Sequence, residues 1–109
     1  MGRSPATNFV PVTVFSPVVL PDAEDDLRGA YRWYFDRSPL AADAFRAEAL
    51  QAIDGLAQTA DRWSKDSEGI HSYHLRHFPY TVFYEIDGSK AIVLAVAHQR
   101  RRPGFWRAR

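Results

Sequence analysis

Residues 80–97 read YTVFYEIDGSKAIVLAVA, and this stretch decides the fold. Two runs rich in β-branched and aromatic residues flank Asp87-Gly88, a dipeptide typical of a tight hairpin turn. The second run, Ala91 to Ala97, is apolar on both faces and predicts a central strand that is covered on each side or deeply buried. Another strand-like run, Ile70 to His77, comes earlier and is separated by a turn around Phe78-Pro79. The second half of the chain therefore predicts a three-stranded antiparallel meander.

Two amphipathic helices are predicted before the meander. The first begins near Pro21, because proline suits a first helical turn and the acidic residues that follow lie where the helix dipole is positive. It ends near Arg37, because Ser38-Pro39 is typical of an N-cap followed by the first-turn proline of another helix. Apolar residues recur at three- and four-residue spacing in both segments. So short a break predicts an antiparallel helical hairpin.

The segment before the helices predicts the first strand. Residues Phe9 to Phe15 (FVPVTVF) favour a strand, and Pro11 places its start at a sheet edge or outside the ladder. Its best partner is the apolar run Ala91 to Ala97, since pairing would shield both. Residues 1–8 are small and polar, so we expect a flexible N-terminal extension and a single domain over residues 9–109. The fold class is α+β, with the hairpin packed on one face of a small sheet.

Composition excludes several classes of protein. The chain has 109 residues and no cysteine, which rules out a disulfide framework and any thiolate metal site. No apolar run approaches the roughly 18 residues of a membrane helix, so we expect a soluble cytoplasmic domain that contacts no membrane. Nucleotide-binding loops and nucleophile elbows have no matching motif, and we expect no cofactor.

Charges are segregated along the chain. Residues 22–68 hold eleven acidic and six basic residues, whereas residues 69–109 hold two acidic and seven basic ones. Such an asymmetry suggests an anionic partner for one face. Twelve of the fourteen basic residues are arginine, which favours planar, bidentate recognition of carboxylate or phosphate.

The four histidines do not predict a metal site. A metal requires converging ligands, and here His71 and His77 share one face of the predicted strand while His74 points to the other. His98 follows the last strand. One sheet face thus offers at most two of these side chains, with no supporting acid at a matching position.

Aromatic residues gather in two places. Tyr31, Trp33, Tyr34 and Phe35 crowd the first helix and cannot all face the core, so they form either a contact surface or a large core contact. The C-terminal segment mixes arginines with rings, which suits phosphate contact and base stacking but also an acidic protein partner. Its residues of interest are Arg100, Arg101, Arg102, Phe105, Trp106 and Arg107.

Three separated stretches, in this order, resemble the RelE/ParE family of bacterial type II toxins. They are the helical hairpin over residues 21–56, LRHFPYTVFYEID at 75–87, and VLAVAHQRRRPGFW at 93–106. The last stretch resembles the ParE or plasmid stabilisation branch, whose final strand runs into a His-x-x-Arg-x-Pro-x-aromatic pattern. Here those positions are His98, Arg101, Pro103 and Phe105-Trp106. The resemblance covers about residues 12–107 and implies the same α+β fold.

The resemblance implies a cytoplasmic toxin that a cognate antitoxin neutralises in a hetero-oligomer. Plausible antitoxin contacts are Tyr31, Trp33, Tyr34 and Arg76. The resemblance implies that ParE-like members bind DNA gyrase and lack catalytic groups. Because basic and aromatic residues are concentrated after the last strand, we expect the C-terminal segment to contact gyrase. Those target contacts would be Arg100, Arg101, Arg102, Phe105, Trp106 and Arg107.

RelE-like members instead cut messenger RNA on the ribosome by 2′-hydroxyl attack, which requires a base, cations and an acid. Basic residues of that branch correspond here to Ser72, His74 and Thr81, of which only His74 titrates. This sparse set favours the non-enzymatic branch. A nuclease would use His74 or His98 as the base and Arg76 or Arg100 at the phosphate. A third reading is an inactive remnant that only binds an antitoxin.

Overall fold

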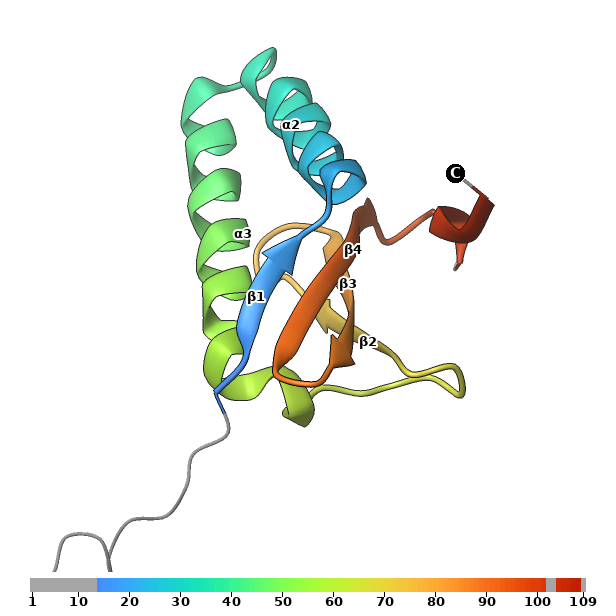
Figure 1. Ribbon diagram of the computed structural model, residues 1–109. Helices are drawn as coiled ribbons and strands as arrows, with labels where there is room; N and C mark the ends of the chain where they lie inside the picture. Colours follow the sequence, from blue (N-terminus) through green and yellow to red (C-terminus); the bar gives the residue numbers. More distant parts are fainter. Residues whose placement is uncertain (1–13, 102–103, 109) are drawn as a thin grey trace, which may run out of the picture.

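The computed structural model describes residues 14–101 and 104–108 (Figure 1). The predicted extension, residues 1–8, lies outside this part of the chain. Two helices stand between a first strand and a group of three strands. The elements are β1 (Ser16–Val19), α2 (Pro21–Phe35), α3 (Pro39–Thr59), the 3-10 turn η1 (Ala60–Arg62), β2 (Ile70–His74), β3 (Tyr80–Asp87), β4 (Lys90–His98) and the 3-10 turn η2 (Phe105–Ala108).

The strands form one four-stranded sheet in the order β1-β4-β3-β2. β2, β3 and β4 make the predicted antiparallel meander, and β1 runs parallel to β4. The α2–α3 hairpin covers one face of the sheet (Figure 1). We call the opposite face the open face. The α+β prediction is confirmed, and the apolar run at 91–97 lies in a central strand.

The predicted first strand, Phe9 to Phe15, is wrong at its described end. Residues 9–13 lie outside the described chain, and Val14 and Phe15 are not part of β1. Phe15 donates its amide to the Ala57 carbonyl of α3 and buries its ring in the core. Its backbone therefore bonds to the helix and not to β4. Pairing begins at Ser16, whose amide donates to the Ser89 carbonyl. Pro17, the next residue along this edge strand, points its nitrogen away from β4, where no donor is needed.

The helix boundaries follow the two prolines. α2 begins at Pro21 and α3 at Pro39, and the Ser38 hydroxyl accepts the Ala41 amide at 3.2 Å, as an N-cap should. α2 ends at Phe35, two residues before the predicted end near Arg37. The 34–38 stretch instead forms a turn in which the Tyr34 carbonyl accepts the amides of both residue 37 and Ser38.

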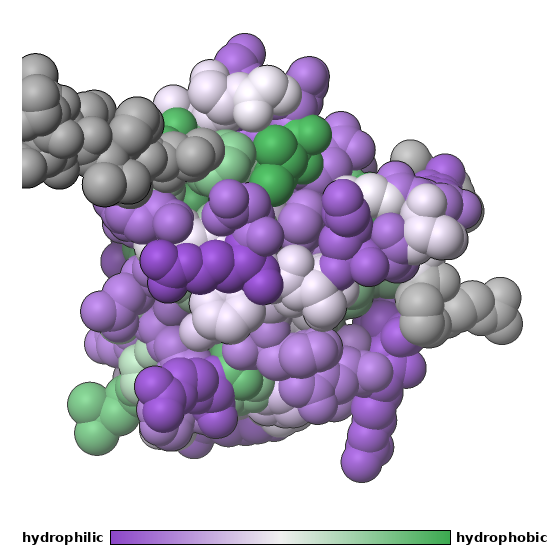
Figure 2. All heavy atoms as spheres, turned by 90° about the horizontal axis from the view of Figure 1, so that it is seen from below, coloured by the Kyte–Doolittle hydropathy of each residue, from purple (hydrophilic) through white to green (hydrophobic). Residues whose placement is uncertain are grey.

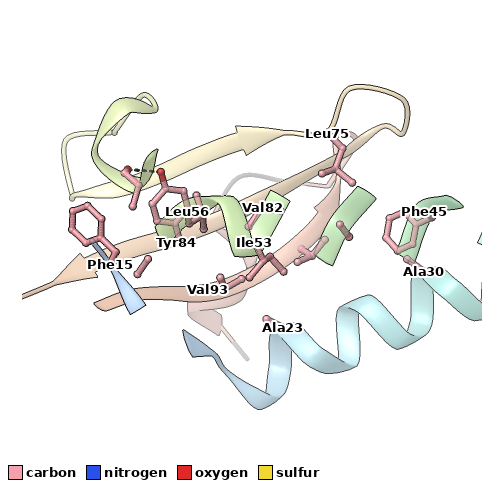
Figure 3. Packing of buried hydrophobic residues seen from close by; sticks show 14 residues of the cluster. Phe15, Ala23, Ala30, Phe45, Ile53, Leu56, Leu75, Val82, Tyr84 and Val93 are labelled. Atoms are coloured by element: carbon pink, nitrogen blue, oxygen red, sulfur yellow. Dashed lines mark hydrogen bonds between the residues drawn. The ribbon is translucent and has the colours of Figure 1, made fainter. Parts of the chain in front are cut away.

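The core lies between the helical hairpin and the sheet (Figure 3). Phe45 of α3 packs against a ring cluster that Tyr34, Phe78 and Tyr80 complete. At the other end, Tyr84 is fully buried and donates its hydroxyl to the Ala60 carbonyl at 2.5 Å. Burial raises the pKa of Tyr84 to about 12. This bond ties the central sheet to the end of α3.

A β-bulge in β4 changes its register opposite Phe83 and Tyr84. β1 accompanies β4 only as far as Val93, and the amide of Val96 donates to the Asp26 carboxylate of α2 at 2.9 Å. Asp26 is one of the acidic residues that follow Pro21 near the start of α2, where the helix dipole favours negative charge. The structure shows that it also satisfies a strand amide that β1 does not reach.

The prediction that His71 and His77 share a strand face is wrong, because β2 ends at His74. The chain then turns, and the Leu75 amide donates to the Tyr80 carbonyl. His77 lies in this turn, where its backbone amide and Nδ1 both bond to the Glu48 carboxylate of α3. His71 is buried instead, stacked on Tyr84 with its Nδ1 bonded to the Trp63 carbonyl.

Seen from below the view of Figure 1, the surface is mostly hydrophilic with small, separate hydrophobic areas (Figure 2). No helix among the described residues is long and apolar enough to cross a membrane. Within the same residues, no three side chains of the metal-binding types lie close enough together to hold an ion.

Candidate functional site

A cleft of about 400 Å³ lies on the open face of the sheet, at the end where β4 finishes. β2 and β3 supply its floor, the turn at 66–70 supplies one wall, and the C-terminal segment supplies another. We call it the open-face cleft. Its lining residues are Asp66, Ile70, Ser72, His74, Thr81, Phe83, His98, Gln99, Arg101, Gly104, Trp106 and Arg107.

His74 is the titratable side chain on the floor of the open-face cleft. It lies directly opposite Thr81 in the β2–β3 ladder, and its Nδ1 is 2.7 Å from the Thr81 hydroxyl. Thr81 is only 2% exposed, so its hydroxyl orients the imidazole and cannot itself reach a ligand. The other ring nitrogen, Nε2, remains available to a bound group.

The structure places the candidate bases and the candidate phosphate-binding arginines of the nuclease alternative in different surroundings. His98 lies opposite Tyr80, and its ring packs edge-on against that core tyrosine at 5.4 Å, on the helix-covered side. The Arg100 amide donates to the His98 Nδ1 at 3.1 Å. Arg76 lies beside α3, where its amide bonds to Glu48. Only His74 and His98 of this set line the open-face cleft, and they approach it from different faces of the sheet.

The C-terminal segment folds back against the open face. The Trp106 ring lies 4.4 Å from the Phe83 ring of β3, and the Arg107 guanidinium forms an ion pair with Glu68. Arg101 stacks over the Phe105 ring at 3.9 Å. The sequence-predicted target contacts Arg101, Trp106 and Arg107 are therefore brought together at one cleft. Arg102 lies outside the described residues.

The acidic wall of the open-face cleft is a tight turn. The Asp66 carboxylate accepts the amides of Ile70 at 2.9 Å and Glu68 at 2.8 Å. The hydrogen bond from the Ile70 amide lowers the pKa of Asp66, and smaller contributions in the same direction come from Glu68, Arg107 and Gly69. The cleft therefore combines arginines with carboxylates and rings, an arrangement suited to a partner that offers both charge and planar groups.

A larger groove, about 820 Å³, runs between the two helices. We call it the helical groove. Tyr31 lines it and donates its hydroxyl to Asp43 at 3.0 Å, a bond that raises the pKa of the tyrosine. Apolar and charged side chains alternate along its walls. Its lining residues are Glu24, Leu27, Arg28, Tyr31, Arg32, Phe35, Asp43, Phe45, Arg46 and Leu50.

The four predicted antitoxin contacts lie in four different environments. Tyr31 lines the helical groove, whereas Tyr34 packs in the core, where burial raises its pKa. Trp33 is half exposed and carries the Arg37 guanidinium 3.7 Å above its ring. Arg76 lines a separate groove on the far side of α3, beside Trp63 and Tyr73. The aromatic crowding on α2 thus serves both the core and the surface.

Sequence reasoning missed several residues that shape these sites. Phe83 lies three residues after Tyr80 in β3, and this spacing places it on the open face. Glu68 lies in the loop before β2, and nothing in the local sequence indicates that it meets Arg107. For the helical groove, Leu50 lies outside the buried stripe of α3 and is partly exposed. A leucine outside the buried stripe of a helix is a sequence signal for a contact surface.

Comparison with known proteins identifies the family. Residues 18–103 match the profile described as "ParE toxin of type II toxin-antitoxin system, parDE". No match was found among the curated proteins. The fold resembles that of a chain in the chromosomal ParDE toxin–antitoxin system from P. aeruginosa, with 20% identity and a TM-score of 0.71 over 79% of this chain and 97% of that one.

A second similar fold occurs in the toxin–antitoxin complex RelBE2 from Mycobacterium tuberculosis. That chain is 19% identical, with a TM-score of 0.53 over 81% of this chain and 94% of that one. These two likenesses concern the fold, and the profile match spans most of the sequence. The chain therefore belongs to the ParE toxin family of type II toxin–antitoxin systems.

Proposed function

We propose that this toxin inhibits DNA gyrase by binding it, using the open-face cleft and the C-terminal segment as the contact surface. The observation that carries the proposal is the convergence of Arg101, Trp106 and Arg107 at one cleft. Arginine and tryptophan are the residues that most often dominate protein interfaces, because they combine apolar area with directed hydrogen bonds. The other predicted contacts are Arg100, Arg102 and Phe105. We place this activity in the cytoplasm, where gyrase acts.

Gyrase supercoiling of relaxed plasmid tests the proposal directly. Wild-type protein should inhibit the reaction, and Arg101→Ala and Trp106→Ala should each weaken inhibition by about tenfold, the size of a modest hot-spot loss. Arg37→Ala is the matched control, since it removes an exposed arginine stacked on Trp33, away from the open-face cleft. Undiminished supercoiling with the folded wild-type toxin would contradict the proposal.

We further propose that the antitoxin docks an amphipathic helix in the helical groove. Leu27, Phe35 and Leu50 offer apolar contacts along it, and arginines and acids stand on both walls. Leu50→Asp should abolish capture by the antitoxin, because it puts a charge against the apolar face of the partner. The same variant should still inhibit gyrase, since Leu50 lies on the helices, away from the open face.

A second candidate function is cleavage of messenger RNA on the ribosome, which the His74–Thr81 pair favours. There His74 would take the proton of the 2′-hydroxyl, and Arg101 would face the phosphate. Cleavage of ribosome-bound message by the wild type, lost in His74→Ala with gyrase unaffected, would select this function. A chain that inhibits neither gyrase nor translation yet binds the antitoxin would be the inactive remnant.

A further inference from the structure

We propose that residues Gly104–Arg107 act as a releasable strap, whose docking on the open face competes with the target for Trp106 and Arg107. The identity of the target rests on the proposed function, whereas the strap itself is a property of the isolated chain. The observation behind it is that two predicted target contacts are already engaged within the molecule. Trp106 packs on Phe83, and Arg107 pairs with Glu68.

The contacts that hold the strap are of a reversible kind. The side chains of Arg107 and Glu68 are 47% and 62% exposed, so water and salt screen their attraction. The Trp106–Phe83 contact is tilted by 35° and lies on the open face, which the helices do not cover. The exposed ion pair and the ring contact bias the strap toward docking, and a competing partner can replace both.

The side that receives the strap is already formed. Asp66 bonds to the amides of Glu68 and Ile70, and Gly69 adopts a positive φ of 86° within the same turn. Glu68 therefore uses its backbone to hold the turn and leaves its carboxylate for Arg107. Because this turn is already ordered, docking costs it little conformational entropy. The free energy of docking therefore depends mainly on the strap.

Gly104 fits the docked conformation of the strap. Its φ is 80°, and a Cβ built at this position would lie 2.5 Å from the Arg107 Nη1. The Arg107 amide donates to the Gly104 carbonyl at 3.0 Å, and the guanidinium lies beside residue 104. A side chain at residue 104 would strain the turn, because φ is positive there, and the flexible end of Arg107 would have to shift to make room.

Competition follows from these contacts. A target that binds Trp106 must displace Phe83, and one that binds the Arg107 guanidinium must displace Glu68. The apparent affinity for the target is then reduced by the fraction of molecules in which the strap is docked. Glu68 is accordingly a residue that restrains the toxin without touching its target.

The strap is tested in the isolated full-length chain labelled with 5-fluorotryptophan. Its three tryptophans give separate fluorine resonances, with Trp106 assigned by Trp106→Phe and the other two serving as reporters of folding. Glu68→Gln should increase the released population by about two- to fivefold, the effect of losing one exposed ion pair, and added salt should do the same in the wild type. Asp54→Asn, which removes an equal charge from an exposed position on α3, should leave the Trp106 resonance unchanged.

A Trp106 resonance that responds no more to Glu68→Gln than to Asp54→Asn would overturn the strap. The second arm measures gyrase binding, where Glu68→Gln should bind about two- to fivefold more tightly than wild type. Release of the strap with unchanged or weaker gyrase binding would overturn the competition. If wild-type toxin does not bind gyrase at all, the proposed function fails, and the fluorine measurement still decides whether the strap exists.

Discussion

Removal of one buried hydroxyl, in Tyr84→Phe, probes how the sheet is fastened to the end of α3. Tyr84 has no exposed surface, and its hydroxyl donates to the Ala60 carbonyl at 2.5 Å (Figure 3). Ala60 is itself fully buried, so the substitution leaves its carbonyl with one hydrogen bond fewer and no water to replace it. We expect the free energy of unfolding at neutral pH to fall by about 1–2 kcal/mol.

The same variant should change the dependence of stability on pH. Burial raises the Tyr84 pKa from 10 to about 12, so this group contributes stability that is fully present below pH 10 and is lost as the pH rises toward 12. The difference between these two pKa values corresponds to at most about 3 kcal/mol. The phenylalanine variant cannot ionise here and should lose less stability over that interval. A smaller alkaline loss should remain, because burial also raises the pKa of Tyr34 and Tyr80.

Urea unfolding followed by circular dichroism at pH 8 and at steps between pH 9.5 and 11.5 measures both effects. The difference between wild type and Tyr84→Phe should be largest at pH 8 and should shrink as the medium becomes alkaline. Equal stabilities at pH 8, or a constant difference over the alkaline steps, would refute the assignment of this hydroxyl as a buried link.

Three further substitutions have expected outcomes that chemical denaturation can check. Ser38→Ala removes the N-cap of α3 and should cost about 1 kcal/mol, whereas Ser38→Asp should retain most of the stability; equal losses would contradict the cap. Phe45→Ala should cost about 3–5 kcal/mol because it empties the centre of the ring cluster, and a loss below about 1 kcal/mol would mean that the cluster collapses around it. Burial acts to raise the pKa of Glu48, but the hydrogen bonds from residues 76 and 77 outweigh burial and lower that pKa. Glu48→Gln should therefore reduce the free energy of unfolding by roughly 1–2 kcal/mol at pH 7, and this cost should fade as the pH falls below 4.5. A cost that does not change with pH would count against an ionised Glu48 at this contact.

Much of the fold could be predicted because local signals agreed with tertiary packing. Pro21 and the Ser38-Pro39 pair mark helix starts whatever surrounds them, since both act within one turn. Gly88 supplies a positive φ of 60° in the β3–β4 hairpin, as the Asp87-Gly88 signal indicated. The unbroken apolar run of β4 likewise revealed its central place, because only a strand shielded on both sides tolerates it.

The errors arose where tertiary contacts decided the outcome. The predicted strand FVPVTVF includes Phe15, yet this residue bonds to α3 and buries its ring in the core, and β1 begins only after it. Propensity does not specify the residue at which pairing with a neighbouring strand begins. The predicted strand Ile70 to His77 is longer than β2 for a similar reason, because Glu48 binds the turn at residues 76 and 77.

The candidate site was predictable in composition but not in arrangement. The arginines and rings after β4 indicated a contact surface, and Arg101, Trp106 and Arg107 do meet at the open-face cleft. That Glu68 and Phe83 would engage them could not be read from spacing, because the partners lie far apart in the sequence. Alternation along a strand gives the face of a side chain, and only the folded chain gives its neighbour.

The carboxylate of Asp26 has a consequence for how the molecule meets other copies of itself. A central strand flanked for only half its length exposes backbone donors and acceptors of the kind that recruit a foreign strand. By binding the Val96 amide, Asp26 occupies one of these donors and sets a negative charge beside the gap. A charged residue beside an unpaired strand segment opposes edge-to-edge pairing, so the Asp26 carboxylate disfavours addition of a foreign strand where β1 ends.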